Sequence, residues 1–357
     1  MSYQNSLYFK TIAMLPTPIR IQDQEIAFVG VGVIAQFFAH ALMTGGAHKL
    51  SLITAHSQQL QGGITVEGKK VAPTYHVVND SKSLTTNPDI VFITCQAGDS
   101  EKLIALKNSG KVGPNTLLVV AQNGLKPEQT IMDIFPDNPV AGMIISAQIR
   151  YENEPDGKTL PKILVPKQVK YEIGLTQGGL HNSQVLQDLS DFLNANGLTK
   201  VQVLNPADFM EARFMKHFKN MRNLASFRVA KESKTPATYQ DGLDDAKAKE
   251  EADTAILELY TLYLKHHEIL GTLPVPFANI LETTIGYATT THIPTTSANY
   301  HARKPIESLT QPILQMAKQL GIPESDFPTI VRFDSEFNAY NFSSPHNETR
   351  PLNSGGL

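Results

Sequence analysis

Small residues near the start of the chain have the spacing of a turn that binds a dinucleotide. Gly30, Gly32 and Ala35 form the pattern Gly-x-Gly-x-x-Ala. In such a turn the first glycine permits the bend, the second lets the backbone approach a pyrophosphate, and the small third residue lets a helix lie close to a strand. Free N–H groups at the helix N-terminus then attract the anion. The alternative is a glycine turn in an α/β domain that binds no nucleotide.

Lys216, Asn220 and Asn223 have side chains suited to the reduction of a carbonyl group. They stand at positions i, i+4 and i+7, so on one helix they converge on one patch. Hydride delivery to a ketone leaves negative charge on the oxygen, which a nearby ammonium stabilises and then protonates. We therefore expect Lys216 to be a proton donor. The alternative is a solvated cationic helix face.

The sequence Gln122-Asn123-Gly124-Leu125 directly follows an apolar run at residues 116–121. That run predicts a buried parallel strand, and ligands bind at the carboxyl ends of such strands. By itself, Asn-Gly is an ordinary turn, because both residues tolerate a positive φ.

The segments around these motifs predict alternating strands and helices, followed by helices alone. An apolar run at 26–29 and a helical stripe at 34–42 flank the glycine turn. Further strands are expected at 49–54, 89–94, 116–121, 139–147, 162–174 and 200–203, with a hairpin at 62–78 and helices at 100–108 and 183–194. Long helices are expected from Asp208 onwards, including 241–270, 277–289 and 305–320.

The predicted fold class is α/β, with an N-terminal Rossmann-type doubly wound sheet and a C-terminal all-α domain. The expected divisions are an N-terminal extension (1–20), a dinucleotide-binding domain (21–205), a helical substrate and catalytic domain (206–342) and a flexible tail (343–357). A length of 357 residues exceeds that of one usual core and agrees with two domains.

Composition argues against several classes of protein. The net charge is −3 and the chain contains no large basic block, which argues against nucleic acid as a partner. Cys95 is the one cysteine, which excludes an intrachain disulfide and a multi-cysteine zinc site; no metal is expected. Lys10 and two prolines interrupt the N-terminal segment, and no apolar run has the length of a membrane span. We expect a cytoplasmic protein without membrane contact.

The end of the second expected strand bears on the choice of cofactor. Residues Thr54, Ala55, His56 and Ser57 contain no acid to bind the ribose 2′-hydroxyl of NAD, which favours NADP. No arginine is present for the 2′-phosphate either, so NAD stays open.

Taken in order, these motifs resemble those of the ketopantoate reductase (2-dehydropantoate 2-reductase) family over residues 25–327. The Gly-x-Gly-x-x-Ala turn comes first, and Asn123-Gly124 resembles the family's Asn-Gly turn. Phe214-x-Lys216-x-x-x-Asn220 resembles its Trp-x-Lys-x-x-x-Asn helix. Lys304-Pro305-Ile306-Glu307 resembles its Arg-Pro-Thr-Glu segment.

The resemblance implies a reductase that converts 2-dehydropantoate to pantoate with NADP, a step of pantothenate biosynthesis. It implies Lys216 as the general acid and Glu307 as a second catalytic residue. The implied substrate-binding residues are Asn123, Asn220, Asn223 and Asn299. The implied cofactor-binding residues are Gly30, Val31, Gly32, Val33, Ile34, Ala35, Thr54, His56, Gln96 and Asn123.

Departures from the family pattern leave the substrate and the cofactor preference open. Phe214 replaces the tryptophan, Leu224 stands where the family has a second asparagine, and Gln96 replaces a lysine. Thr295 and Asn299 replace its Ser-x-x-x-Asp run. The alternatives are a paralogue that reduces another 2-oxo acid, or a non-catalytic nucleotide-binding protein that kept the fold. A homodimer is compatible with the sequence, which does not determine the oligomeric state.

Overall fold

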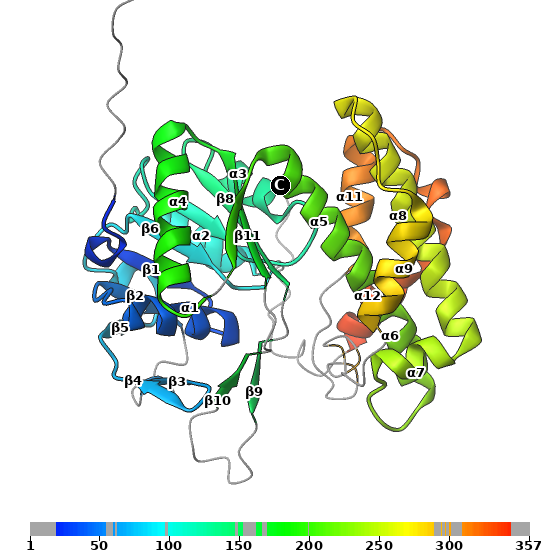
Figure 1. Cartoon of the computed structure of the whole chain (residues 1–357), viewed down its shortest axis with the longest axis horizontal. Helices are drawn as coiled ribbons and strands as arrows, with labels where there is room; N and C mark the ends of the chain where they lie inside the picture. Colours follow the sequence, from blue (N-terminus) through cyan, green and yellow to red (C-terminus); the bar gives the residue numbers. More distant parts are fainter. Residues whose placement is uncertain are drawn as a thin grey trace, which may run out of the picture.

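The computed structural model describes residues 19–54, 60, 63–96, 99–146, 149–152, 162–165, 170–198, 200–288, 294, 297, 300 and 309–343. A sheet flanked by helices forms one part of the molecule and a group of helices forms the other (Figure 1). Helix α5 (Pro206–Met221) begins beside the sheet and extends into the helical part. The predicted fold class is thereby confirmed.

The main sheet has eight strands in the order β12-β11-β8-β7-β6-β1-β2-β5. From β5 to β8 neighbouring strands are parallel, whereas β11 is antiparallel to β8. The strand order reverses at β1, between β2 and β6, as in a Rossmann sheet. The strands are β1 (Ile26–Val29), β2 (Leu50–Ile53), β5 (Tyr75–Val78), β6 (Ile90–Ile93), β7 (Leu117–Val120), β8 (Val140–Ser146), β11 (Lys170–Gln177) and β12 (Val201–Leu204).

Helices cover both faces of this sheet, so its central strands are apolar at every position. On one face, Phe28 of β1 stacks on Phe92 of β6 and shares a core with α1 (Val33–Thr44) and α4 (Leu180–Ala195). On the other face, Val29 shares a core with α2 (Ser100–Asn108) and α3 (Pro127–Ile134). This arrangement presents the turn after β1 at the carboxyl edge of the sheet.

A second, four-stranded sheet corrects two predictions. Its order is β4-β3-β10-β9, and its strands are β3 (Ile64–Val66), β4 (Lys69–Val71), β9 (Arg150–Glu152) and β10 (Lys162–Leu164). The hairpin expected over 62–78 comprises only β3 and β4, whose turn residues Glu67 and Gly68 both have positive φ. Strand β5 instead pairs with β2 in the main sheet, and the single strand expected at 162–174 is divided between the two sheets.

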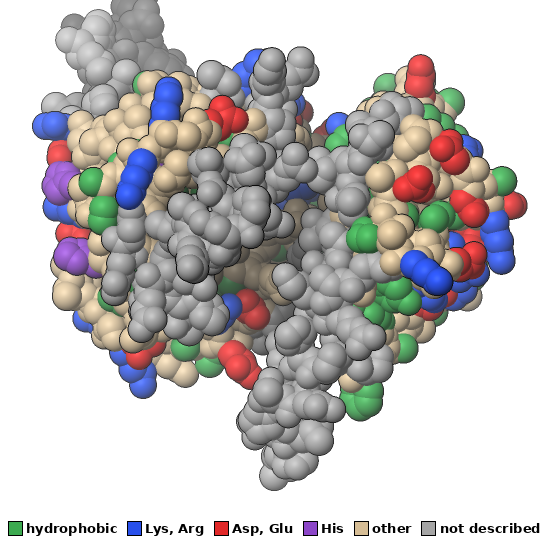
Figure 2. All heavy atoms as spheres, turned by 90° about the horizontal axis from the view of Figure 1, so that it is seen from below, with side chains coloured by type: hydrophobic (Ala, Val, Ile, Leu, Met, Phe, Trp, Pro, Cys, Tyr) green, Lys and Arg blue, Asp and Glu red, His purple; other side chains and the backbone are tan. Residues whose placement is uncertain are grey.

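The helical part packs around a core that includes Phe214, Phe218, Leu259 and Phe333. Its helices are α5, α6 (Asn223–Glu232), α7 (Tyr239–Asp244), α8 (Ala246–Leu270), α9 (Phe277–Ala288), α11 (Gln311–Gln319) and α12 (Pro328–Ser343). Short 3₁₀ turns occur at Ile21–Asp23, Ser81–Ser83 and Glu324–Asp326. On the face drawn in Figure 2, acidic and basic side chains of the helical part are interspersed and are not gathered by sign.

Helix boundaries differ from the predicted ones where a capping side chain starts a new helix. The helix expected over 241–270 is two helices, because Asp245 leaves the helical conformation and accepts a hydrogen bond from the N–H of Ala248. The helix expected from 305 begins at Gln311, and residues 301–308 lie outside the described part. Helix α12 was not predicted. No helix in the described ranges is long and apolar enough to span a bilayer.

Candidate active site

The turn after β1 has the geometry that its first glycine was predicted to provide. Gly30 has a φ of +88°, and a Cβ added to it would lie 2.5 Å from the Cα and N atoms of Cys95, just beyond β6. The Thr94 hydroxyl donates a 2.6 Å hydrogen bond to the carbonyl oxygen of Gly30. Both the left-handed conformation and the close approach therefore require glycine at position 30.

The second glycine of the motif, Gly32, has free space beside its Cα atom. Gly32 is exposed at the N-cap of α1, and a Cβ added there would meet no heavy atom of the described residues within 4 Å. The first turn of α1 contains no acidic residue, and Ala35 is fully buried against the sheet. An uncovered helix N-terminus with room before it fits the pyrophosphate of a dinucleotide.

The other predicted cofactor residues lie around the same edge, with one outside the described ranges. Val31, Val33, Ile34 and Thr54 are partly buried and Gln96 is exposed, whereas His56 lies outside the described residues. In the part of the chain that the structure describes, no group of three or more His, Cys, Asp or Glu side chains could hold a metal ion.

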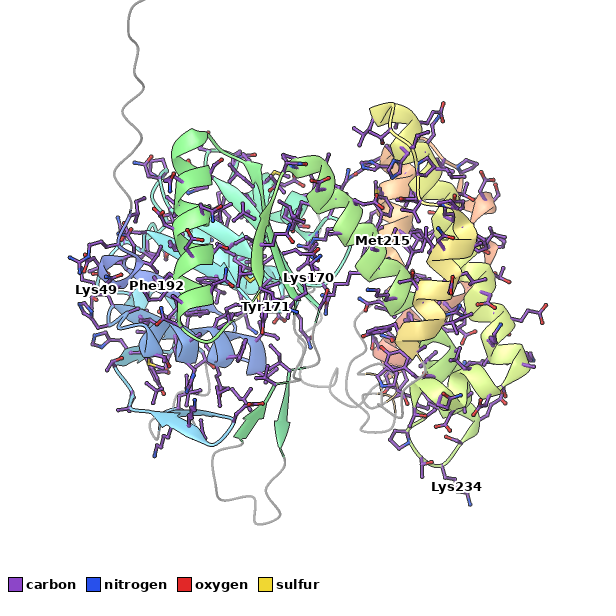
Figure 3. The ribbon with its side chains drawn as sticks, viewed as in Figure 1. Lys49, Lys170, Tyr171, Phe192, Met215 and Lys234 are labelled. Atoms are coloured by element: carbon purple, nitrogen blue, oxygen red, sulfur yellow. The ribbon has the colours of Figure 1, made fainter. Side chains whose placement is uncertain are left out.

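The structure brings Lys216 and Asn123 together although they are 93 residues apart. The Nζ atom of Lys216 donates a 2.9 Å hydrogen bond to Oδ1 of the exposed Asn123 side chain. Phe214 and Phe218 bury one face of α5 in the helical core, which leaves Lys216 on a partly exposed face. Met215, its neighbour, marks this place on α5 in Figure 3.

Strand register places the Asn123 turn and the glycine turn at one edge of the sheet. Val29 of β1 pairs with Ile93 of β6, which pairs with Val120 of β7. Strands β1 and β7 are separated by one strand, or about 10 Å. The lysine contact and the predicted nucleotide site therefore lie at neighbouring positions along this edge.

The segment that starts α11 packs against both α5 and the Asn123-Gly124 turn. His217 is fully buried, and its Nε2 lies 2.9 Å from the carbonyl oxygen of Leu309. Burial, with smaller contributions from the charges of Lys216 and Arg213, lowers the pKa of His217 to about 4, so the neutral ring donates this bond. A Cβ added to Gly124 would lie 3.6 Å from Pro312.

The remaining predicted substrate residues have different placements. Asn220 is partly buried on α5, one turn beyond Lys216. Asn223 does not continue that helix, which corrects the i, i+4, i+7 prediction. The helix ends at Met221 because Arg222 forms a tighter turn, and its guanidinium binds Asp253 and Thr284 in the helical part. Asn299 and Glu307 lie outside the described residues.

Some contacts at this site have no signal in the sequence. Arg213 pairs with Glu128, 85 residues away, and both side chains are buried. Neither residue belongs to a motif, and no local pattern connects them. His217 is adjacent to Lys216 in the sequence, and this adjacency is a weak signal that could have identified His217 as a residue of the site.

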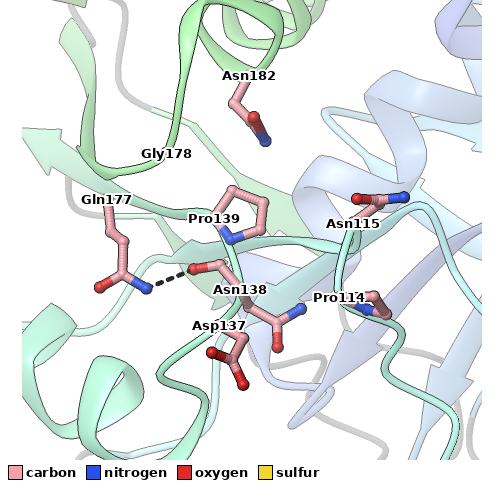
Figure 4. Close-up of a pocket in the computed structure, with 8 residues that line it drawn as sticks. All are labelled: Pro114, Asn115, Asp137, Asn138, Pro139, Gln177, Gly178 and Asn182. Carbon is pink, nitrogen blue, oxygen red and sulfur yellow. Dashed lines mark hydrogen bonds between the residues drawn. The ribbon is translucent and has the colours of Figure 1, made fainter.

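A separate cavity of about 410 Å³ opens at the opposite edge of the sheet, beyond the start of β8 (Figure 4). Gln177 donates a hydrogen bond to the carbonyl oxygen of Asn138 at its wall. Its lining includes none of the predicted site residues, so this cavity is not the candidate active site.

Comparison with known proteins agrees with the fold and with the resemblance to ketopantoate reductases. Residues 26–160 match the model of the ketopantoate reductase PanE/ApbA family. The 2-dehydropantoate 2-reductase from Methylococcus capsulatus has a TM-score of 0.69 at 16% identity, over 92% of this chain and 98% of that one. A PanE/ApbA family ketopantoate reductase from Ralstonia eutropha JMP134 has a TM-score of 0.69 at 16% identity, with coverages of 90% and 99%.

A D-mandelate dehydrogenase solved with NADH and anilino(oxo)acetate is equally similar. Its TM-score is 0.69 at 16% identity, over 89% of this chain and 98% of that one. No curated protein matches the sequence. The predicted resemblance is confirmed: residues 26–160 match the ketopantoate reductase PanE/ApbA family model, and the chain as a whole has the ketopantoate reductase fold at low sequence identity.

Proposed function

We propose that this protein is an NAD(P)H-dependent reductase of 2-oxo acids, with Lys216 as the general acid. The contact between Lys216 and Asn123, beside an open helix N-terminus, is the observation that supports this function. A nicotinamide cofactor, bound across Gly30, Gly32 and Ala35, would supply the hydride. The binding set would also include Val31, Val33, Ile34, Thr54, His56, Gln96 and Asn123.

In this proposal the side chains of α5 and its neighbours perform the proton transfer. Lys216 holds a proton on Nζ, and Asn123 Oδ1 orients that ammonium by accepting one of its hydrogens. Lys216 donates the proton to the carbonyl oxygen as negative charge develops there. Asn123 and Asn220 orient the 2-oxo acid, and the resemblance adds Asn223 and Asn299 to the substrate-binding set. Glu307 binds the hydroxyl or carboxylate end, and Leu309, two residues beyond it, lies against α5.

For the substrate we propose 2-dehydropantoate, reduced to pantoate by a hydride from NADPH, which is thereby oxidised to NADP. The motifs that resemble those of ketopantoate reductases support this substrate, and the absence of an acidic residue at Thr54, just after β2, supports NADP. A second candidate is another 2-oxo acid. The similarity to D-mandelate dehydrogenase, which was solved with NADH and an oxoacetate, favours it.

The test is consumption of NADPH and NADH by the purified protein with 2-dehydropantoate and with a panel of other 2-oxo acids. We expect Lys216→Ala to lower kcat by about 10²–10⁴-fold while cofactor affinity is retained. Lys219→Ala, one turn along α5, is the matched control and should keep wild-type turnover.

Each outcome distinguishes the candidates. Turnover of a different 2-oxo acid alone would indicate the paralogue. Cofactor binding without turnover on any oxo acid would indicate a non-catalytic nucleotide-binding protein. Full turnover by Lys216→Ala would refute the role of that lysine.

A further inference from the structure

Arg213 is a buried cation one turn before Lys216 on α5. Its side chain is 1% exposed, its Nη2 pairs with the Glu128 carboxylate, and its Nη1 donates a 3.1 Å hydrogen bond to the main-chain oxygen of Gln122. The guanidinium carbon lies 5.2 Å from the centre of the Phe209 ring. The guanidinium therefore contacts a carbonyl, a carboxylate and the aromatic ring of Phe209, which lies one turn earlier on α5.

The two oxygen partners of Arg213 flank the turn that carries Asn123. Gln122 immediately precedes Asn123, and Glu128 lies in the first turn of α3 just after it. One planar guanidinium thus bridges both ends of this turn. Because Lys216 contacts the Asn123 side chain from the same helix, α5 holds the turn at three points.

The same contacts extend to the predicted nucleotide site. The Gln122 amide donates a 3.0 Å hydrogen bond to the carbonyl oxygen of Cys95. Cys95 in turn is the residue against which the Gly30 turn packs. Arg213 is therefore linked through Gln122 and Cys95 to the turn of the Gly-x-Gly-x-x-Ala motif.

Two glycines of the sheet make room for the Arg213–Glu128 pair. Gly142 of β8 and Gly174 of β11 are directly paired across the strands. A Cβ at Gly174 would lie 2.5 Å from the Phe209 ring, and one at Gly142 would lie as close to that ring and would overlap the Glu128 carboxylate. The absence of side chains at these two positions allows Phe209, Arg213 and Glu128 to pack between α5 and the sheet.

Stability alone does not account for an ion pair at this place. Desolvation offsets much of the attraction within a buried pair, and apolar side chains of similar size often stabilise a core as well or better. The Nε atom of Arg213 is buried without a hydrogen-bond partner among the described residues. What an apolar pair could not do is bind the main-chain oxygen of Gln122.

We propose that Arg213 is a positioning residue, which clamps the turn at Gln122 and Glu128 and so holds Asn123 at the ammonium of Lys216. The effect of Arg213 on catalysis rests on the proposed function, whereas its effect on the conformation of the turn does not. Arg213 acts through Asn123 and touches no substrate.

The kinetic test is a double-mutant cycle with Arg213→Lys and Asn123→Ala. Lysine keeps the positive charge, but its single ammonium cannot reproduce the bridge of a planar fork. We expect Arg213→Lys to lower kcat about tenfold with cofactor Kd unchanged, and to have almost no further effect when Asn123 is already alanine. Additive effects of the two substitutions would overturn the proposal.

A second readout does not depend on activity. Hydrogen exchange of the peptide covering residues 122–128 should be faster in Arg213→Lys than in the wild type, even if no substrate is turned over. Arg222→Lys is the matched control, because Arg222 is equally buried and pairs with Asp253 away from the sheet. It should leave exchange in this peptide unchanged and should be additive with Asn123→Ala.

A third variant covers failure of Arg213→Lys to fold. Arg213→Met combined with Glu128→Met removes both buried charges, and proteins commonly tolerate the replacement of a buried ion pair by apolar side chains. This folded variant should show the same faster exchange at residues 122–128. Wild-type exchange in it would refute the clamp, whereas a wild-type protein inactive on every oxo acid would refute only the proposed function.

Discussion

The two glycines of the turn after β1 should respond differently to replacement by alanine. Gly30→Ala should lower the stability of the fold, whereas Gly32→Ala should lower the affinity for the cofactor. Gly30→Ala imposes a left-handed φ on a residue with a Cβ, which costs about 1–2 kcal/mol. The methyl group would also lie 2.5 Å from the backbone of Cys95, and overpacking of this kind costs about 1–3 kcal/mol. We therefore expect the free energy of unfolding to fall by about 2–5 kcal/mol, measured by urea denaturation.

Gly32→Ala should instead weaken cofactor binding and leave the fold intact. Position 32 has a φ of −84° and a ψ of −168°, which alanine adopts without strain, and within the part of the chain that the structure describes the added methyl group meets no atom within 4 Å. We expect a stability loss below about 1 kcal/mol. The methyl group would occupy the space before the helix, so the Kd for NADPH should rise at least about tenfold, equivalent to about 1.4 kcal/mol.

The measurement is a titration that follows the emission of the reduced nicotinamide. The chain contains no tryptophan, so protein emission interferes little. Gly179→Ala is the matched control, since Gly179 is also an extended N-cap glycine, on α4, and none of the described atoms lies within 4 Å of its added Cβ. It should bind cofactor like the wild type. Unchanged affinity in Gly32→Ala, or an equal loss in Gly179→Ala, would contradict the proposed pyrophosphate position.

Two further predictions concern buried ionisable side chains. Because burial lowers the pKa of His217 from 6.5 to about 4, the unfolded chain binds a proton there before the folded protein does. The free energy of unfolding should therefore fall by about 3 kcal/mol as the pH drops from 6.5 to 4, a loss that His217→Gln should lack; parallel pH profiles of the two proteins would disprove it. Glu258 on α8 accepts hydrogen bonds from two N–H groups at the start of α12. Glu258→Gln should cost about 2 kcal/mol in urea unfolding, and Glu250→Gln, exposed on the same helix, should cost almost nothing.

Features that depend on neighbouring residues could be predicted from the sequence. A buried run, a Gly-x-Gly-x-x-Ala turn and an amphipathic helix follow one another between Ile26 and Thr44. Their periodicity and turn chemistry are local, so the strand, the turn and the helix could be recognised before the fold was known. The same holds for the change from a Rossmann sheet to helices near residue 205.

Boundaries set by distant contacts could not be predicted in this way. The break at Arg222 accompanies hydrogen bonds to Asp253 and Thr284, which are 31 and 62 residues away. Strand β5 has the alternation of a hairpin strand, yet it pairs with β2 in the main sheet. Helix α12 begins where the Glu258 carboxylate accepts its first N–H groups across 72 residues.

The sequence by itself determined the types of residue available for chemistry: a glycine turn, an Asn-Gly pair and a lysine on a helix. Only the tertiary structure decided that Lys216 contacts Asn123 and that Arg213 pairs with Glu128 across 85 residues. The physical reason is that such contacts depend on how α5 packs against the sheet, at the Gly142 and Gly174 positions, and helical periodicity carries no information about a partner so far along the chain.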